Sequence, residues 1–345
     1  MILEQKTVFV TGGTGLLGSH LLFSLASGGR KIIALRRQNS NLDFVRKVFG
    51  YYSDKPADLF KSIEWVESDL RNSDFLKKTI KGSDQVYHCA AVVSFENSRK
   101  EEIIKTNTLV TSNIVKACLE LGIGKLCHVS STAALGAAKN KIIVSEDHHW
   151  DDSDIHSAYS VSKHLSEVEV WEGIKHGLSA VIVNPSVIFG PGNWNAGSSM
   201  FFSKIAKGMP FYTSGVTGYV DVRDVVKSMV LLMNSPVSNE RFIISAENLS
   251  YKQVFWMIAD SMGVRKPYIP IPELASYPVS GILKIMSLIR PGKSAITPET
   301  LHSAFSKVYL DNKKIREATG ISFIPISQSV ADTSRIYRAE KGGTV

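Results

Sequence analysis

Short apolar runs rich in β-branched residues alternate with longer amphipathic stretches over the first half of the chain. Such runs predict strands buried in a sheet, and the stretches between them predict helices. Parallel strands joined by helices on both faces produce this alternation, so an α/β protein with a doubly wound parallel sheet is predicted. We expect strands at residues 7–11, 31–37, 63–69, 85–91, 125–131 and 180–186, and helices over 16–27, 101–121 and 158–176.

The alternation stops near residue 185, and eleven of the twelve prolines lie from there onward. Prolines this dense separate short elements and predict a loop-rich lobe. We therefore expect a first domain over residues 1–184 and a smaller α+β lobe formed mainly by 185–345. Strands near 219–222 and 241–245 are candidates to complete the sheet of the first domain.

Composition narrows the class of protein. The chain has 345 residues, of which 44% are hydrophobic and 21% charged, with a net charge of +8. The basic residues are scattered, so nucleic-acid binding is not expected, and a polyanionic cofactor explains the charge more simply. Three cysteines without metal-ligand spacing or a secretion signal indicate reduced thiols, a cytoplasmic location and no metal site.

A glycine-rich turn joins the first predicted strand to the first predicted helix. The stretch "TGGTGLLG" (residues 11–18) places Gly12, Gly15 and Gly18 at every third position. In such a turn the first glycine permits the tight bend, the second admits a pyrophosphate, and the third brings the helix close to the sheet. The amide groups of the helix N-terminus then face the phosphates. The sequence therefore predicts a dinucleotide site.

The end of the second strand indicates which dinucleotide binds. NAD sites usually carry an acidic residue here, which accepts from the ribose 2′-hydroxyl. This strand ends in Arg36 and Arg37, and the first acidic residue after them is Asp43. Arginine pairs with a 2′-phosphate, so NADP(H) is the preferred cofactor and NAD(H) the alternative.

Two further stretches suggest acid–base chemistry. In "YSVSK", Tyr159 and Lys163 are four residues apart and share one face of a helix. A nearby ammonium lowers the pKa of a phenol, which can then exchange a proton with a reacting hydroxyl. In "VSSTAALG" (residues 129–136), one of three hydroxyls at a strand end could bind the reacting oxygen: Ser130, Ser131 or Thr132.

Together these motifs resemble the extended short-chain dehydrogenase/reductase family of the NAD-dependent epimerase/dehydratase type. The similarity covers nearly the whole chain with its motifs in order. Besides those above, the matching stretches are "SDL" ending at Leu70, "HCAA" with Ala90 and Ala91, "TN" at Thr106–Asn107, "NPSVIFGPG" (184–192) and "YVDVRDVV" (219–226).

The resemblance implies a Rossmann domain and assigns site residues. It implies that Thr132 is the catalytic hydroxyl, acting with Tyr159 and Lys163, and that Lys163 also contacts the nicotinamide ribose. The implied cofactor contacts are Gly12, Thr14, Gly15, Leu16, Leu17, Gly18, Arg36, Arg37, Asp69, Leu70, Ala90, Ala91, Val92, Asn107, Ser130, Ser131, Tyr159, Lys163, Pro185, Ser186 and Val187.

Three functions are compatible with this resemblance. The favoured one is an NAD(P)(H)-dependent oxidoreductase that interconverts a carbonyl and a secondary alcohol, similar to dihydroflavonol reductases and 3β-hydroxysteroid dehydrogenases. A nucleotide-sugar epimerase with tightly held NAD is the alternative, and a non-catalytic cofactor sensor is less favoured. Sugar dehydratases carry Asp-Glu after the catalytic threonine, where this chain has Ala133–Ala134.

The partners expected are a small-molecule substrate and a second copy of the chain. Related enzymes often dimerise through two long helices, here near 101–121 and 158–176. Substrate-lining segments are expected at 94–100 and 192–202. A membrane-surface role for the apolar segment 275–289 is not favoured over a place in the core of the second lobe.

Overall fold

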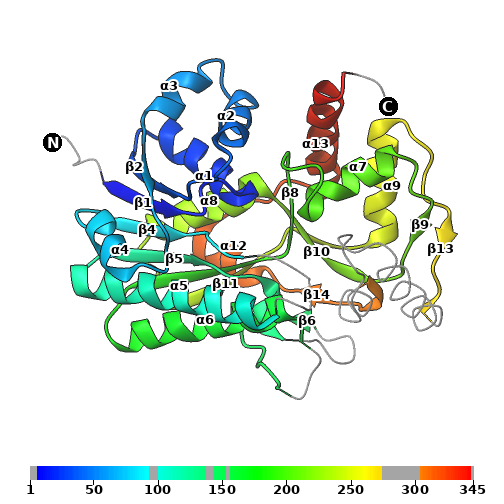
Figure 1. Cartoon of the computed structure of the whole chain (residues 1–345). Helices are drawn as coiled ribbons and strands as arrows, with labels where there is room; N and C mark the ends of the chain where they lie inside the picture. Colours follow the sequence, from blue (N-terminus) through cyan, green and yellow to red (C-terminus); the bar gives the residue numbers. More distant parts are fainter. Residues whose placement is uncertain (1–5, 93–99, 137–142, 153–155, 274–303, 343–345) are drawn as a thin grey trace.

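The computed structural model describes residues 6–92, 100–136, 143–152, 156–273 and 304–342 (Figure 1). The apolar segment 275–289 and most of the expected lining segment 94–100 lie outside these residues. Within the described parts, no helix combines the length and apolar character that a membrane span requires.

A seven-stranded parallel sheet forms the first domain and confirms the predicted α/β class. Its strand order is β11-β7-β5-β4-β1-β2-β3, so the order reverses between β1 and β4, where doubly wound sheets open a crevice for ligands. The strands are β1 (Thr7–Thr11), β2 (Lys31–Arg36), β3 (Ile63–Glu67), β4 (Gln85–His88), β5 (Lys125–Val129), β7 (Ala180–Pro185) and β11 (Glu240–Ile244).

Helices cover both faces of this sheet (Figure 1). The alternation along β1 assigns its side chains to two cores: Val8 and Val10 pack in one hydrophobic cluster and Phe9 in the other. The flanking helices are α1 (Leu16–Ser27), α2 (Leu42–Gly50), α3 (Pro56–Lys61), α4 (Ser73–Ile80), α5 (Lys100–Leu121), α6 (Ala158–Lys175), α8 (Val222–Met233) and α12 (Lys313–Thr319).

The second half of the chain contributes β11, α8 and α12 to the large sheet and its flanking layer, and its other elements gather around a second sheet. The strand expected near 219–222 differs from expectation: it is part of β10 (Val216–Asp221), which pairs with β8 (Val187–Phe189) and β12 (Glu247–Ser250) in a three-stranded sheet. Local sequence does not specify this partner choice, because both partners are distant in the chain. The aromatic core of the lobe includes Phe189 and Tyr219.

Smaller elements complete the described structure. The helices of the second lobe are α7 (Met200–Ala206), α9 (Tyr251–Met262) and α13 (Ile326–Glu340). Two-residue strands pair as β9 (Phe211–Tyr212) with β13 (Ile269–Pro270) and as β6 (Ile143–Val144) with β14 (Tyr309–Leu310). Short 3-10 turns are η2 (Thr132–Leu135) and η3 (Gly197–Ser199).

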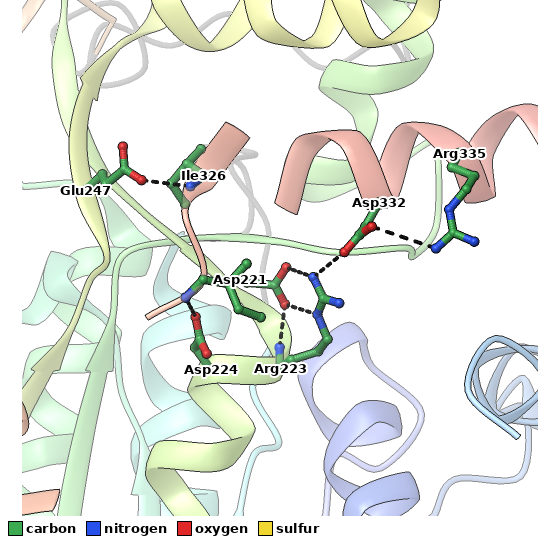
Figure 2. Close-up of polar contacts among 8 residues, drawn as sticks. Asp221, Arg223, Asp224, Glu247, Ile326, Asp332 and Arg335 are labelled. Atoms are coloured by element: carbon green, nitrogen blue, oxygen red, sulfur yellow. Dashed lines mark hydrogen bonds and ion pairs between the residues drawn. The ribbon is translucent and has the colours of Figure 1, made fainter. Parts of the chain in front are cut away.

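Carboxylates of the preceding elements hold the C-terminal segment in place (Figure 2). The Asp224 carboxylate accepts from the Ile324 amide at 2.7 Å, and Glu247 accepts from the Ile326 amide at 2.8 Å. Arg223 joins Asp221 and Asp332 at 2.8 and 2.9 Å. These contacts fix α13 against the start of α8.

Replacing Asp221 with alanine should lower the free energy of unfolding by about 1–3 kcal/mol. The carboxylate is buried, accepts from the Arg223 amide at the N-terminus of α8 and pairs with the Arg223 guanidinium, so its loss removes a cap and an ion pair. Urea unfolding measures the change. Asp43→Ala, which breaks an exposed pair with Arg46, is the control and should cause no measurable loss. Equal effects of the two substitutions would refute this role of Asp221.

Candidate active site

Two glycines of the turn between β1 and α1 are required by the chain itself. Gly12 has φ +71°, and a Cβ there would lie 2.6 Å from the Ala90 nitrogen. A Cβ on Gly18 would lie 2.1 Å from the Gly12 carbonyl oxygen. At Gly12 the turn lies too close to the chain after β4, and at Gly18 the first turn of α1 lies too close to Gly12, for a side chain at either position.

Gly15 is different, because nothing in the chain excludes a side chain there. A Cβ at Gly15 would meet only the Gly12 carbonyl oxygen at an ordinary 3.5 Å, and the residue is exposed. Gly15 is also the N-cap of α1, which has no side-chain cap for its first amides. An open cradle in front of free amide donors fits a pyrophosphate. Thr14, Leu16 and Leu17 flank it.

The end of β2 separates the two arginines into different environments. Arg36 pairs with Glu67 on the neighbouring strand at 2.9 Å. Arg37 is exposed, and its backbone amide donates to the Ser40 hydroxyl at 2.9 Å. Arg37 is therefore the more available guanidinium for a phosphate.

The end of β3 presents Asp69 as an ion-paired carboxylate. Arg71 Nε donates to Asp69 Oδ2 at 2.8 Å, and these hydrogen bonds hold the pKa of Asp69 below its usual range. The carbonyl oxygen of Leu70 accepts from Asn113 Nδ2 at 3.0 Å, so α5 fixes this loop.

Asn107 on α5 holds the loop that follows β4. Its Oδ1 accepts from the Val92 amide at 2.8 Å, and its Nδ2 donates to the Val92 carbonyl at 3.0 Å and to Ser162 Oγ at 3.1 Å. The Ala90 amide donates to the Thr11 hydroxyl at 3.3 Å, and Ala91 lies exposed at the same edge. The backbone expected beside the cofactor is thus held by side chains from β1 and α5.

Lys163 is buried on α6, with 4% of its surface exposed. Its Nζ donates to the Val129 carbonyl at 2.8 Å, at the end of β5. Burial lowers the pKa of Lys163 to about 8, and the nearby Glu167 carboxylate acts in the opposite direction. Its charge is therefore sensitive to pH in the neutral to mildly alkaline range.

The hydroxyl that reaches Tyr159 belongs to Ser131. Burial raises the pKa of the Tyr159 phenol, and a hydrogen bond with the Ser131 side chain lowers it. The expectation that Lys163 depresses this pKa differs from the structure, in which burial has the largest effect. Ser131 is also the N-cap of η2 and accepts from the Ala133 amide at 3.2 Å, whereas Thr132 is the first residue of η2.

Other expected contacts meet at the same carboxyl edge of the sheet. Ser130 has a buried hydroxyl without a hydrogen-bond partner. Pro185 ends β7, Val187 begins β8, and the Ser186 amide between them donates to the Ile244 carbonyl at 3.0 Å. This edge therefore assembles residues from β1, β4, β5, β7 and α6.

Two histidines lie beneath this edge. The rings of His88 and His128 pack with centroids 5.3 Å apart, and both side chains are buried. Burial lowers the pKa of His88 to about 3 and that of His128 well below its usual range, so both are neutral at physiological pH. Over the parts of the chain that the structure covers, no cluster of His, Cys, Asp and Glu could hold a metal ion.

A doubly wound sheet, a glycine turn and a Tyr-Lys pair at the carboxyl edge define an extended short-chain dehydrogenase/reductase. The family model described as "NAD dependent epimerase/dehydratase family" matches residues 8–245, and the chain belongs to that family of enzymes.

Named relatives extend the similarity over most of the chain. It is 28% identical to "Sterol demethylase protein B" of Methylococcus capsulatus over 272 residues, covering 77% of both chains. It is 26% identical to "Dihydroflavonol 4-reductase" of Gerbera hybrida over 271 residues, covering 74% of this chain and 73% of the relative. The crystal structure of gox2253 superposes with a TM-score of 0.82 and 26% identity, covering 99% of this chain and all of the other.

Gly15→Ala and Gly12→Ala should have opposite consequences. Gly15→Ala should leave the melting temperature nearly unchanged and weaken dinucleotide binding at least about tenfold, because the methyl group occupies the cradle. Gly12→Ala should lower the melting temperature, because it combines a clash with a strained φ. Calorimetric melting and fluorescence titration with NADPH measure both effects. Unchanged NADPH affinity in Gly15→Ala would refute the proposed use of the cradle.

Proposed function

We propose that this enzyme interconverts a carbonyl and a secondary alcohol with NADP(H), using Tyr159 as general acid and base. The observation that carries the proposal is the hydrogen bond between the Tyr159 and Ser131 side chains, near the end of β5, where the buried Lys163 ammonium donates to the Val129 carbonyl. Two hydroxyls that converge at the carboxyl edge can hold one substrate oxygen between them.

The chain's own residues supply the proton and the oxygen-binding groups. In the reducing direction Tyr159 donates its proton to the substrate oxygen as negative charge develops there, and Ser131 donates a hydrogen bond to the same oxygen. Burial raises the pKa of Tyr159 and so keeps it protonated as a donor. Lys163, on the same helix face, fixes the end of β5 through the Val129 carbonyl, and its positive charge would favour the phenolate once the proton has moved. The nicotinamide, when bound, supplies or accepts the hydride.

We assign the catalytic hydroxyl to Ser131 in preference to Thr132. The two candidates differ by one position, and motif alignment favoured Thr132. The contact with Tyr159 supports Ser131, which is fixed by its capping bond to Ala133. A hydroxyl whose direction is already set loses little entropy when it binds the reacting oxygen.

Tyr159→Phe should lower kcat by roughly 10²–10⁴ and leave NADPH affinity near normal, because it removes only the proton donor. Ser131→Ala should lower kcat by roughly 10–10³, which is the scale for one lost oxyanion donor. Thr132→Val is the matched control and should retain kcat within about threefold. Stopped-flow oxidation of NADPH measures each. A larger loss in Thr132→Val than in Ser131→Ala would reverse the assignment.

The preference for NADP(H) rests on Arg37. Arg37 is exposed at the end of β2, whereas the Arg36 guanidinium is already paired with Glu67 at 2.9 Å. A 2′-phosphate would form a bidentate pair with such a group.

Arg37→Ala should weaken NADPH binding roughly 10–100-fold and leave NADH binding unchanged, because only the phosphate contact is lost. Arg36→Ala should have the smaller effect on NADPH. Titrations with both cofactors test this, together with mass analysis of any nucleotide that copurifies. Stronger binding of NADH than of NADPH would refute the preference, and tightly retained NAD would favour the epimerase alternative.

We also propose a substrate class and an assembly. Relatives named for dihydroflavonol and sterol chemistry support hydroxylated ring compounds as first assay substrates.

A homodimer through α5 and α6 is supported by two large apolar side chains left exposed on these helices, Leu109 at 42% and Val168 at 47%. We propose a cofactor domain (1–184), whose sheet β11 completes, and a mainly substrate-binding lobe (185–345).

A further inference from the structure

A buried carboxylate lies on α6 below the Tyr159–Lys163 pair. Glu167 is four residues beyond Lys163, on the same helix face, and its side chain is 2% exposed. Its Oε1 accepts from Asn184 Nδ2 at 2.5 Å, and its Oε2 faces Arg241 Nη1 at 3.4 Å. Asn184 belongs to the 184–192 motif without an assigned role, and none of these three residues has a part in the proposed reaction.

Asn184 connects this carboxylate to the backbone of Ser131. The residue is fully buried near the end of β7, and its Nδ2 donates a second hydrogen bond to the Ser131 carbonyl at 3.0 Å. A carboxylate and a carbonyl can only accept, so both require the amide NH₂ group. The orientation of the Asn184 amide is thereby fixed, and its Oδ1 remains without a partner.

Arg241 balances the charge of Glu167 and anchors it. The Arg241 guanidinium also donates to the carbonyls of Glu146, at 2.8 Å from Nε, and His148, at 3.0 Å. An ionised carboxylate in this buried position would be costly without such a partner. The ion pair between Arg241 on β11 and Glu167 on α6 therefore holds the Glu167 carboxylate in place as an acceptor for Asn184.

From these contacts we propose that Glu167 and Asn184 are positioning residues for Ser131. Asn184 fixes the Ser131 carbonyl, and the Ala133 amide fixes its hydroxyl, so the direction of that hydroxyl toward Tyr159 is set at both ends of the residue. The inference rests on the proposed function, in which Ser131 binds the substrate oxygen. The further claim is that Glu167, acting through Asn184, determines how precisely Ser131 binds that oxygen.

Other side chains of α6 hold the residues on either side of Ser131. Ser160 donates to the Ala133 carbonyl and Lys163 donates to the Val129 carbonyl. The Ser131 carbonyl lies between these two in sequence and accepts from the Ala134 amide at 3.0 Å and from Asn184 Nδ2 at 3.0 Å. Asn184 in turn connects it to Glu167 on α6. Loss of Asn184 would keep the local bonds of Ser131 to the amides of Ala133 and Ala134, and would remove the side-chain contact that holds the Ser131 carbonyl against β7 and Glu167.

A double-mutant cycle tests the proposal. Asn184→Ala should lower kcat roughly 10–100-fold, the scale expected when a catalytic group is displaced by about 1 Å, with little change in NADPH affinity. In the Ser131→Ala background the same substitution should have almost no further effect, because the residue it positions has lost its hydroxyl. Glu167→Gln keeps an acceptor for Asn184 and should retain kcat within about threefold. Asn248→Ala is the control, since Asn248 is an amide that bonds the Leu310 backbone away from α6.

A readout that needs no substrate separates this proposal from the proposed function. The ¹³Cζ chemical shift of Tyr159, assigned with Tyr159→Phe, reports its hydrogen bond to Ser131. Ser131→Ala and Asn184→Ala should shift it in the same direction, and Asn248→Ala should not. Additive losses in the cycle, or an unchanged Tyr159 shift in folded Asn184→Ala, would overturn the positioning role. Absence of NADPH-dependent turnover in the wild type would instead overturn the proposed function, while the shift would still test Asn184.

Discussion

The site depends on how buried backbone carbonyls are satisfied where parallel strands end. The Ser130 amide makes the last backbone bond from the end of β5 to β7, and the residues that follow it are still buried or half-buried. Buried carbonyls need donors. Lys163 on α6 donates to the Val129 carbonyl. Asn184 on β7, which also donates to Glu167 of α6, donates to the Ser131 carbonyl together with the Ala134 amide. The donors that satisfy these carbonyls also position the reactive hydroxyls. The contacts that stabilise this edge of the sheet are therefore the ones that arrange its chemistry.

The sheet and its helices were largely predictable because their signals are local. The strands that become β1 to β5 and β7, and the helices that become α1, α5 and α6, lie within a few residues of their expected bounds. Hydrophobic period and turn residues act over neighbouring positions, and they determine these elements. The glycine turn was recognisable for the same reason, since strand, turn and helix follow one another directly.

Long-range partners limited the prediction elsewhere. The position of β10 in a second sheet depends on pairing with β8 and β12, which no local pattern encodes. The sequence could not decide which of the adjacent hydroxyls, Ser131 or Thr132, is catalytic. The choice depends on which of them faces Tyr159, and that is set by the tertiary fold. Asn184 was part of a recognised motif without an assigned role, and its two acceptors come from residues 17 and 53 positions away.

The return of β11 to the large sheet has a consequence for synthesis of the chain. The edge of β7 is covered only when residues 240–244 pair with it, 59 positions after Pro185. At typical translation rates of 5–20 residues per second, that is a delay of roughly 3–12 s. During this interval an apolar strand has one unpaired edge, which is the kind of surface that chaperones protect and that nascent chains use to aggregate.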